Sequence, residues 1–289
     1  MSIFAVAGVQ MPVPVTGNNL LAMEHLVEKT MHIYPWVEMV VFSELAMHGP
    51  LSTLAKDDPT EDEAVFSALA QKFGIWICPG SQFVRRGEHI YNHAVVIDPR
   101  GEIAGRYDKM FPFRPFEIGV AGGSEYLIFD IVGVGRFGLS VCYDIWFPET
   151  TRTLTAHGVE VLIHPVLTGT TDRATELVIA QATGAMFQCY VFDVNGLDAG
   201  GVGRSLVVDP TGRVVHQAGQ ASEIFPIDIN LDMVRRVRRR GAHGLGQMLK
   251  SFRDGPQHYP VYDAPAGHHY LQSLGELEKP DRANIPEYE

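Results

Sequence analysis

Short apolar runs alternate with stretches of helical spacing along most of this chain, and few folds accept such a pattern. The apolar runs are rich in Val, Ile and Phe, as buried strands are. Strands that alternate with helices predict an α/β domain with both faces of its sheet covered. The expected strands are 3–10, 37–45, 74–83, 92–98, 136–144, 159–166, 189–196 and 204–209, and the expected helices are 18–32, 60–73, 149–157, 173–188 and 230–240.

Two segments of the chain repeat one pattern. NHAVVIDPRGEIAGR and GRSLVVDPTGRVVHQ both run from a strand through Asp-Pro-x-Gly into a second strand. Proline presets φ in such a turn and glycine closes it, so both segments predict β-hairpins. The repetition is either a coincidence between two common turns or a sign of two similar halves that pack sheet against sheet. The second interpretation predicts a four-layer α-β-β-α sandwich with two pseudo-symmetric halves.

Charge and cysteine content narrow the classes of function. The 289 residues carry a net charge of −11. This charge argues against nucleic acid or an anionic membrane as the main partner, because both attract positively charged proteins. The three cysteines, Cys78, Cys142 and Cys189, are too few for a disulfide framework and suggest a reducing cytoplasm. The first residues lack a basic region, and no apolar run reaches the roughly 18 residues that span a bilayer. We therefore expect neither a signal peptide nor a membrane helix.

The C-terminal part of the chain differs from the rest. Residues 256–289 have little periodicity and contain five prolines: Pro256, Pro260, Pro265, Pro280 and Pro286. A segment of this kind has no core of its own. We therefore expect one domain over residues 1–255, followed by an arm over 256–289 that packs on this domain or on a neighbouring subunit.

Four residues are candidates for chemistry. Cys142 ends an expected strand and precedes a helix, where a nearby cation would lower its pKa and make it a thiolate. Lys109 is followed by apolar residues, a poor setting for a solvated charge, so its ammonium requires a partner. Glu44 follows another expected strand, as catalytic groups of α/β folds do, and Glu117 lies eight residues after the lysine. Taken singly, each residue type at such a position is more often structural or solvated.

Three segments together resemble the signatures of the nitrilase, or carbon–nitrogen hydrolase, superfamily. They are VVFSELAMHG, YDKMFPFRPFE and GLSVCYDIWFPE, and they carry Glu44, Lys109 and Cys142 in the family's order. The resemblance extends over about residues 3–230. It implies the same α-β-β-α sandwich, which in that family usually dimerises.

The details of these segments resemble some branches of the superfamily more than others. The spacing of eight residues from Lys109 to Glu117 is similar to that of aliphatic amidases and formamidases. Typical nitrilases have Cys-Trp-Glu at the nucleophile, whereas this chain has Cys142, Tyr143 and Asp144. Cys-Tyr-Asp also occurs in ω-amidase-like and carbamoyl-hydrolysing relatives.

The resemblance implies a role for each candidate. Glu44 would take the thiol proton, and Cys142 would attack the amide carbon. Lys109, with a backbone N–H near Tyr143, would stabilise the oxyanion, and Glu117 would orient the lysine or the amide nitrogen. No metal or organic cofactor is needed.

Four aromatic side chains are expected to line the substrate pocket. They lie close to the lysine or the cysteine in sequence: Phe113, Phe116, Tyr143 and Trp146. The size of the pocket depends on how they and the loop 168–172 fold over the site.

The leading hypothesis is therefore an amidase that converts a small amide into a carboxylic acid and ammonia through a cysteine thioester. N-carbamoyl-amine hydrolysis and nitrile hydrolysis are the alternative reactions. A catalytically silent scaffold of the same fold is the non-enzyme alternative. The expected partners are the small-molecule substrate and further copies of the chain, in a homodimer or larger assembly.

Other motifs indicate structure rather than function. The glycines of residues 133–138 match G-x-G-x-x-G but lie between strands, which indicates a hairpin. The arginines of residues 235–240 fall at a helix end, which indicates a solvated or interface face. His89 and His93 lie in an expected strand without metal-ligand spacing, so both are taken as structural.

Overall fold

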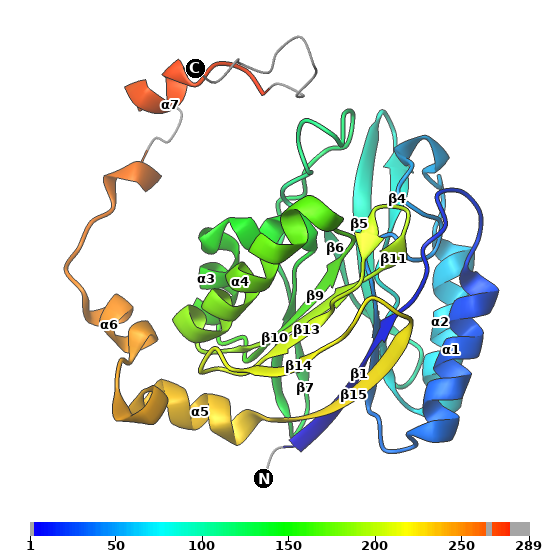
Figure 1. The fold of residues 1–289 in the computed structure, drawn as a ribbon, viewed down its shortest axis with the longest axis horizontal. Helices are drawn as coiled ribbons and strands as arrows, with labels where there is room; N and C mark the ends of the chain where they lie inside the picture. Colours follow the sequence, from blue (N-terminus) through cyan, green and yellow to red (C-terminus); the bar gives the residue numbers. More distant parts are fainter. Residues whose placement is uncertain (1–2, 264–267, 278–289) are drawn as a thin grey trace.

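The computed structural model describes residues 3–263 and 268–277 as two β-sheets packed face to face between two helical layers (Figure 1). Helices α1 and α2 cover one sheet, and α3 and α4 cover the other. The helices are α1 Leu20–Ile33, α2 Thr60–Phe73, α3 Pro148–Ala156, α4 Thr170–Phe187, α5 Leu231–Arg240, α6 Met248–Asp254 and α7 His269–Ser273. The predicted four-layer α-β-β-α sandwich is confirmed.

The first sheet has the order β15-β1-β2-β3-β5-β4, and β6 pairs with β5. Its inner strands β1, β2 and β3 are parallel, and β15 joins β1 antiparallel at the edge. The strands are β1 Ile3–Gln10, β2 Met39–Phe42, β3 Trp76–Cys78, β4 Ser81–Arg86, β5 His89–Ile97, β6 Ile103–Asp108 and β15 Glu223–Asn230.

The second sheet has the order β14-β13-β10-β9-β8-β7 and repeats this plan. Its strands β8, β9 and β10 are parallel, and β7 joins β8 antiparallel. The strands are β7 Leu127–Ile131, β8 Gly135–Leu139, β9 Val161–Val166, β10 Tyr190–Asn195, β13 Leu206–Val208 and β14 Val214–Gln217. The short strands β11 Leu197–Asp198 and β12 Gly201–Val202 pair outside both sheets.

The repeated Asp-Pro-x-Gly pattern marks equivalent hairpins of the two halves. Asp98 joins β5 to β6, and Asp209 joins β13 to β14. Each aspartate accepts hydrogen bonds from the backbone N–H groups two and four residues later. The turn glycines Gly101 and Gly212 have φ of +80° and +84°, which favours glycine. The two halves are therefore pseudo-symmetric.

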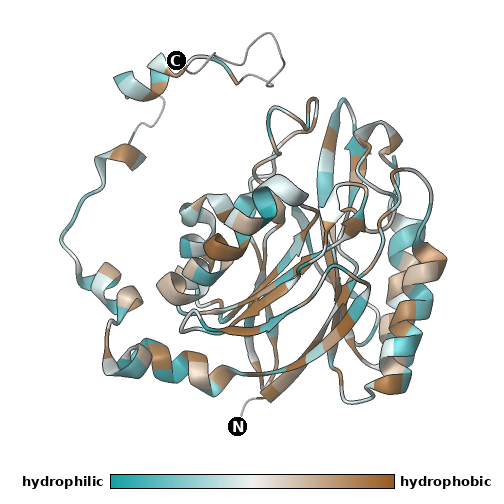
Figure 2. Cartoon of the chain, in the orientation of Figure 1, coloured by the Kyte–Doolittle hydropathy of each residue, from teal (hydrophilic) through white to brown (hydrophobic). Residues whose placement is uncertain are grey.

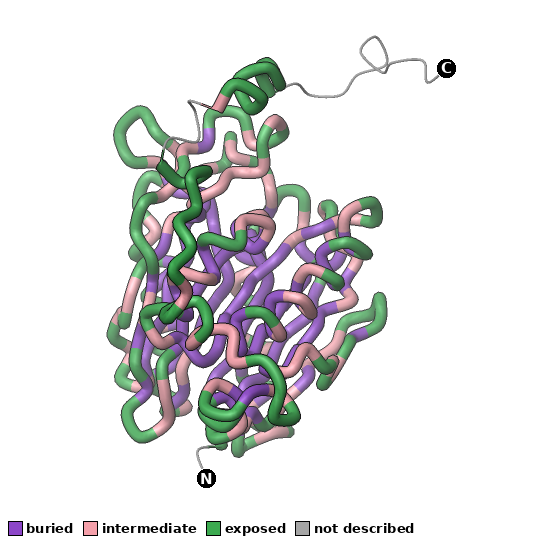
Figure 3. The backbone as a smooth tube through the Cα atoms, turned by 90° about the vertical axis from the view of Figure 1, so that its left-hand side faces the viewer, coloured by how far each residue is buried: buried purple, intermediate pink, exposed green. Residues whose placement is uncertain are grey.

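Apolar residues fill three separate layers of core. One cluster lies between the sheets and includes Phe4, Val41, Phe137 and Phe192. A second lies between the first sheet and α1 and α2, and a third lies under α3 and α4. Hydropathy follows this arrangement, because the strands are largely apolar while the outer helices alternate between polar and apolar faces (Figure 2). Figure 3 shows the same division, with buried strands inside and exposed loops around them.

Three expected strands are divided or shorter than predicted, and these expectations were wrong in detail. The run 74–83 divides at Gly80, whose φ of +81° and close approach to the Ser43 carbonyl leave no room for a Cβ atom. The run 136–144 ends as a strand at Leu139, and residues Cys142–Trp146 form a 3-10 turn. The expected strand 37–45 likewise ends at Phe42, two residues before Glu44.

The arginine-rich end of α5 combines the two alternatives that we expected, a solvated face and an interface. Arg235 pairs with Glu160 at 2.8 Å, and Arg238 donates to the backbone oxygen of Gln188 at 3.0 Å. These two side chains bind α5 to the second half, although Arg235 stays partly exposed. Arg236, Arg239 and Arg240 are exposed as well. Residues 133–138 form the β7–β8 hairpin, as predicted.

The chain after α5 leaves the body of the sandwich (Figures 1 and 3). The ring of Phe252 on α6 lies against the Arg152 guanidinium of α3 at 4.6 Å. Beyond α6, large side chains of the described part are exposed, among them Tyr259, Tyr262 and Leu274. Residues 264–267 and 278–289 of the expected arm lie outside the described residues. Within residues 3–263 and 268–277, no helix is long and apolar enough to cross a bilayer.

Candidate active site

The four candidate residues meet at one end of the two sheets. Glu44 lies two residues after β2, and Cys142 lies three residues after β8, so both follow the carboxyl ends of parallel strands. Lys109 follows β6 directly and reaches Glu44 from the neighbouring hairpin. Clefts at the carboxyl ends of strands are the usual place for binding sites in α/β folds. All four side chains are buried or nearly so.

Glu44 is the hub of this group. Its Oε1 atom accepts hydrogen bonds from Lys109 Nζ at 2.9 Å and from Asn92 Nδ2 at 2.7 Å. Its Oε2 atom accepts one from the backbone N–H of Leu167 at 3.0 Å. Burial raises the pKa of the Glu44 carboxyl, and the Lys109 charge opposes that rise. The carboxylate is thus rigidly held and more basic than an exposed glutamate.

Lys109 lies between two carboxylates. Its ammonium donates to Glu44 Oε1 at 2.9 Å and to Glu117 Oε2 at 3.1 Å, and the residue is only 1% exposed. Burial disfavours the ammonium, but the charges of Glu44 and Glu117 oppose burial, and the pKa of Lys109 lies well above its usual value. The lysine therefore stays charged. Glu117 also accepts a hydrogen bond from the backbone N–H of Phe113.

The Cys142 thiol rests protonated, contrary to our expectation of a low pKa. Burial and the Glu44 charge raise the pKa of the thiol well above its usual range, although Lys109 acts in the opposite direction. The sulfur lies 3.7 Å from Thr168 Oγ1, and it also interacts with the Glu44 carboxylate. Cys142 has a φ of +48°, an unusual value for a residue with a side chain.

The other two cysteines have different surroundings. Cys78 and Cys189 are fully buried, and burial raises the pKa of each thiol to about 12. Neither thiol has an acidic or basic side chain of the Glu44–Lys109 group beside it. Cys142 is therefore the cysteine that is equipped for chemistry.

The expected aromatic residues form one continuous row of rings that includes Tyr143, the residue after Cys142. The Phe113 ring lies 5.2 Å from that of Phe116 and 5.1 Å from that of Tyr143. Trp146 follows at 6.0 Å from Tyr143, and its indole N–H donates to Glu176 at 3.3 Å. The structure thus brings all four predicted side chains together. Phe116 is half exposed, so this row of rings reaches the surface.

Three further residues of the site were not among the catalytic candidates, although Thr168 begins the loop 168–172 that was expected to fold over it. Asn92 binds Glu44, Thr168 touches the sulfur, and Asn195 fixes Thr168 by accepting its backbone N–H at 2.9 Å. Thr168 and Asn195 lie at the ends of β9 and β10, the strands next to β8. The signal available in the sequence was their position at strand ends, the same position that singled out Glu44.

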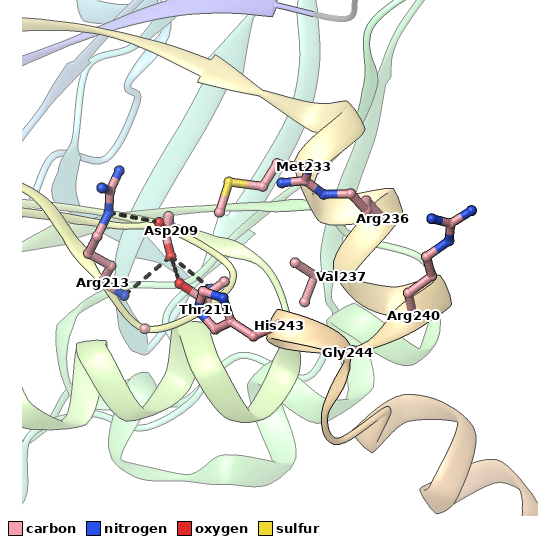
Figure 4. A pocket seen from close by; sticks show the side chains of 11 residues that line it. Asp209, Thr211, Arg213, Met233, Arg236, Val237, Arg240, His243 and Gly244 are labelled. Atoms are coloured by element: carbon pink, nitrogen blue, oxygen red, sulfur yellow. Dashed lines mark hydrogen bonds and ion pairs between the residues drawn. The ribbon is translucent and has the colours of Figure 1, made fainter.

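A cavity of about 800 Å³ lies elsewhere, between the β13–β14 hairpin and α5 (Figure 4). Its lining includes Arg213, Arg236, Arg240 and His243, together with the turn carboxylate of Asp209. None of the four candidate residues contributes to it. This cavity therefore does not coincide with the buried Cys–Lys–Glu group.

The fold and the site together define the class of the protein: a two-sheet α/β enzyme with a buried cysteine, a lysine and two glutamates at its strand ends. Comparison with known sequences identifies the class further. Residues 5–239 match the carbon–nitrogen hydrolase family, and the chain belongs to that family. The family resemblance predicted from the three sequence segments is confirmed.

Proteins similar to this chain include amidases and a nitrilase. The chain is 31% identical to the 2-oxoglutaramate amidase of Bacillus subtilis (strain 168), over 77% of this chain and 88% of that protein. It is 25% identical to the formamidase of Allorhizobium ampelinum, over 91% of this chain and 84% of that protein. The carbon–nitrogen hydrolase structure from Helicobacter pylori G27 superposes with a TM-score of 0.76 at 25% identity, covering 92% and 99% of the two chains. The protein is an amidase of the carbon–nitrogen hydrolase family.

Proposed function

We propose that this amidase cleaves a small primary carboxamide through a thioester on Cys142. The observation that carries the proposal is the buried Lys109 ammonium, which lies within 3.1 Å of two carboxylates, while the charge of one of them, Glu44, acts on the Cys142 thiol. Burying three charged groups is costly unless they are paired and used. A silent scaffold has no need of such a group.

In the first step, Glu44 takes the thiol proton while the sulfur attacks the amide carbon. The raised pKas of the Glu44 carboxyl and the Cys142 thiol suit this transfer, because the thiol needs a base and the base is strengthened by burial. The developing oxyanion receives stabilisation from the Lys109 ammonium and from a backbone N–H near Tyr143. The C–N bond then breaks, and Glu44 returns the proton to the departing nitrogen, which leaves as ammonia.

In the second step, water cleaves the thioester. Glu44 accepts a proton from the water, the hydroxyl adds to the acyl carbon, and the C–S bond breaks to release the carboxylic acid. The proton on Glu44 returns to the Cys142 sulfur, so the enzyme is restored. Glu117 orients Lys109 throughout, because its carboxylate is also held by the backbone of Phe113.

The row of aromatic rings supports a small acyl group. Four rings form a row in which each contacts the next: Phe116, Phe113, Tyr143 and Trp146. Such rings favour apolar over extended polar acyl groups. The relatives named for 2-oxoglutaramate and formamide hydrolysis also act on amides of small acids. We include short aliphatic amides and formamide in the proposed substrate class.

Ammonia release tests this proposal. The purified protein is assayed with formamide, short aliphatic amides, ω-amides of dicarboxylates, carbamoyl amines and nitriles, with Cys142→Ala as the matched control. We expect the wild type to release ammonia from at least one amide and Cys142→Ala to release none. Preference for a carbamoyl amine or a nitrile would replace the proposed substrate class. Release from none of these compounds would favour a catalytically silent scaffold.

We further propose that residues 1–255 form the catalytic domain, that residues 256–289 form an arm that packs on this domain or on a neighbouring subunit, and that the chain forms a homodimer or larger assembly. The exposed Tyr259, Tyr262 and Leu274 support this, since exposed apolar side chains gain from being covered. Three free, buried cysteines fit a reducing cytoplasm. Light scattering that gives only a 31.9 kDa particle at micromolar concentration would contradict the assembly.

A further inference from the structure

The carboxylate of Asp144 lies between the loop that carries Lys109 and the turn that carries Cys142. We propose that Asp144 is a positioning residue that fixes the lysine relative to the nucleophile by binding both segments at once. This proposal goes beyond the roles given above and rests on Lys109 and Cys142 acting as proposed.

On the lysine side, Asp144 holds both flanks of Lys109. The Tyr107 hydroxyl donates to Asp144 Oδ2 at 2.7 Å, and the backbone N–H of Phe111 donates to Oδ1 at 2.9 Å. Tyr107 and Phe111 lie two residues before and two residues after the lysine. The lysine backbone N–H is itself bound to the carbonyl of Asn92 at 2.9 Å. The backbone at Lys109 is thus fixed on three sides.

On the nucleophile side, the same carboxylate holds the turn. The backbone N–H of Val141, the residue before Cys142, donates to Asp144 Oδ2 at 2.9 Å. The Asp144 carbonyl accepts the Thr150 hydroxyl of α3 at 2.8 Å, which anchors the turn to the helix behind it. A movement of the Asp144 side chain would therefore shift Val141 and Phe111 together.

The side chain at position 144 must be a carboxylate rather than an amide. Asp144 is fully buried, and its two oxygens accept three hydrogen bonds, two of them at Oδ2. An asparagine has one acceptor oxygen, so its NH2 group would face at least one N–H or O–H donor. A buried donor without an acceptor is costly, and the segments would separate to avoid it. Burial raises the pKa of Asp144 to about 6, which leaves the carboxylate mostly ionised at neutral pH between the Lys109 cation and the neutral Tyr107 phenol.

The test compares Asp144→Asn with a matched control, Asp209→Asn. Asp209 is also a buried aspartate, 1% exposed, that accepts from the backbone N–H groups of Thr211 and Arg213, but it lies in the remote β13–β14 turn. Displacing reacting groups by about 1 Å can cost on the order of 10²-fold in rate. We therefore expect kcat of Asp144→Asn to fall about 10²-fold with KM within about threefold of the wild type. Asp209→Asn should lower the melting temperature and leave kcat unchanged.

Three outcomes would overturn the proposal. One is a folded Asp144→Asn protein whose kcat stays within about threefold of the wild type. Another is a loss that appears entirely as a higher KM, and the third is an equal loss of kcat in Asp209→Asn at the same folded fraction. If Asp144→Asn does not fold, Tyr107→Phe replaces it, because that change removes one donor and keeps the buried carboxylate. Tyr107→Phe should lower kcat about tenfold, the scale of one hydrogen bond to a charged group, and wild-type kcat would overturn the proposal.

Cys142→Ala separates this inference from the proposed function. Turnover by Cys142→Ala would refute the thioester mechanism whatever Asp144→Asn does. An inactive Cys142→Ala together with a fully active Asp144→Asn would refute only the positioning role.

Discussion

Glu44→Gln tests whether Glu44 is the base that accepts the thiol proton, because it leaves the Lys109 ammonium in place. The carboxylate accepts hydrogen bonds from Lys109 and Asn92 at one oxygen and from the Leu167 N–H at the other. A glutamine can keep its oxygen at the first position, and its NH2 group then faces the Leu167 N–H and the thiol. One hydrogen bond is lost, which costs about 1–3 kcal/mol of unfolding free energy.

The effect on rate should be much larger than the effect on stability. An amide cannot accept the proton of Cys142, and a general base typically contributes about 10²- to 10⁴-fold in rate. Lys109 keeps its second partner, Glu117, at 3.1 Å, so the oxyanion site should survive. We therefore expect a folded Glu44→Gln protein whose turnover is about 10²- to 10⁴-fold lower and whose acyl-enzyme does not form.

Glu117→Gln is the matched control, because the same chemical change occurs on the other carboxylate of Lys109. The glutamine oxygen can still accept from Lys109 and from the Phe113 N–H, so the cysteine should remain able to react while turnover falls. Both variants are mixed with substrate and with acrylamide, and adducts on Cys142 are followed by mass spectrometry. If Glu44→Gln is acylated at the wild-type rate and Glu117→Gln is not, the two roles are reversed.

Three further predictions concern the thiols, pH and the arm. A trace of iodoacetamide should label Cys142 faster than Cys78 or Cys189, because Glu44 can take the proton of Cys142 as it reacts, whereas the other two thiols are fully buried without such a base. Equal labelling would argue against an activated site. The pKa of Asp144 is raised from 3.8 to about 6, so between pH 7 and pH 5 the folded protein takes up a proton that the unfolded chain does not. Over this range the unfolding free energy of the wild type, measured in urea, should rise by about 1 kcal/mol relative to that of Asp144→Asn. No such rise would contradict the raised pKa. Deleting residues 256–289 should reduce the mass in light scattering to that of one chain, and an unchanged assembly would show that the arm is dispensable.

Local pattern was enough to predict most of the elements. The strand 3–10 and the helix 60–73 were predicted to the residue, because each has a clear period and a clear end. Helix α2 has Glu61, Asp62 and Glu63 in its first turn and is followed by Gly74, which has φ of +65°. Acidic residues at the start and a left-handed glycine at the end are strong signals for helix boundaries.

The missed elements had weak or conflicting local signals. Strand β15 contains Pro226, which argues against a strand, yet an edge position next to β1 tolerates a residue without an N–H donor. The interruption at Gly80 depends on how closely the Ser43 carbonyl approaches, and that contact is between segments far apart in sequence. The same limit applies to the turn at Cys142, since its positive φ is imposed by its surroundings.

The site was predictable in its residues but not in its electrostatics. The order of Glu44, Lys109 and Cys142 was available from three sequence segments, and the structure places these side chains together. The net shift in the pKa of the Cys142 thiol depends on its burial and on its distance from Glu44 as well as from Lys109. Local sequence predicts neither the burial nor these distances. Asn92 could have been inferred from hairpin register, since its carbonyl accepts the backbone N–H of Lys109 across β5 and β6.

The most direct test of the central claim is the identity of the acylated residue during turnover. The protein is mixed with acetamide, quenched with acid and digested, and the acyl adduct is located by mass spectrometry. We predict an acetyl thioester on Cys142 and, with Cys142→Ala, neither adduct nor ammonia. An acyl group on another residue, or ammonia release by Cys142→Ala above about one hundredth of the wild-type rate, well beyond what residual binding alone should provide, would contradict the account.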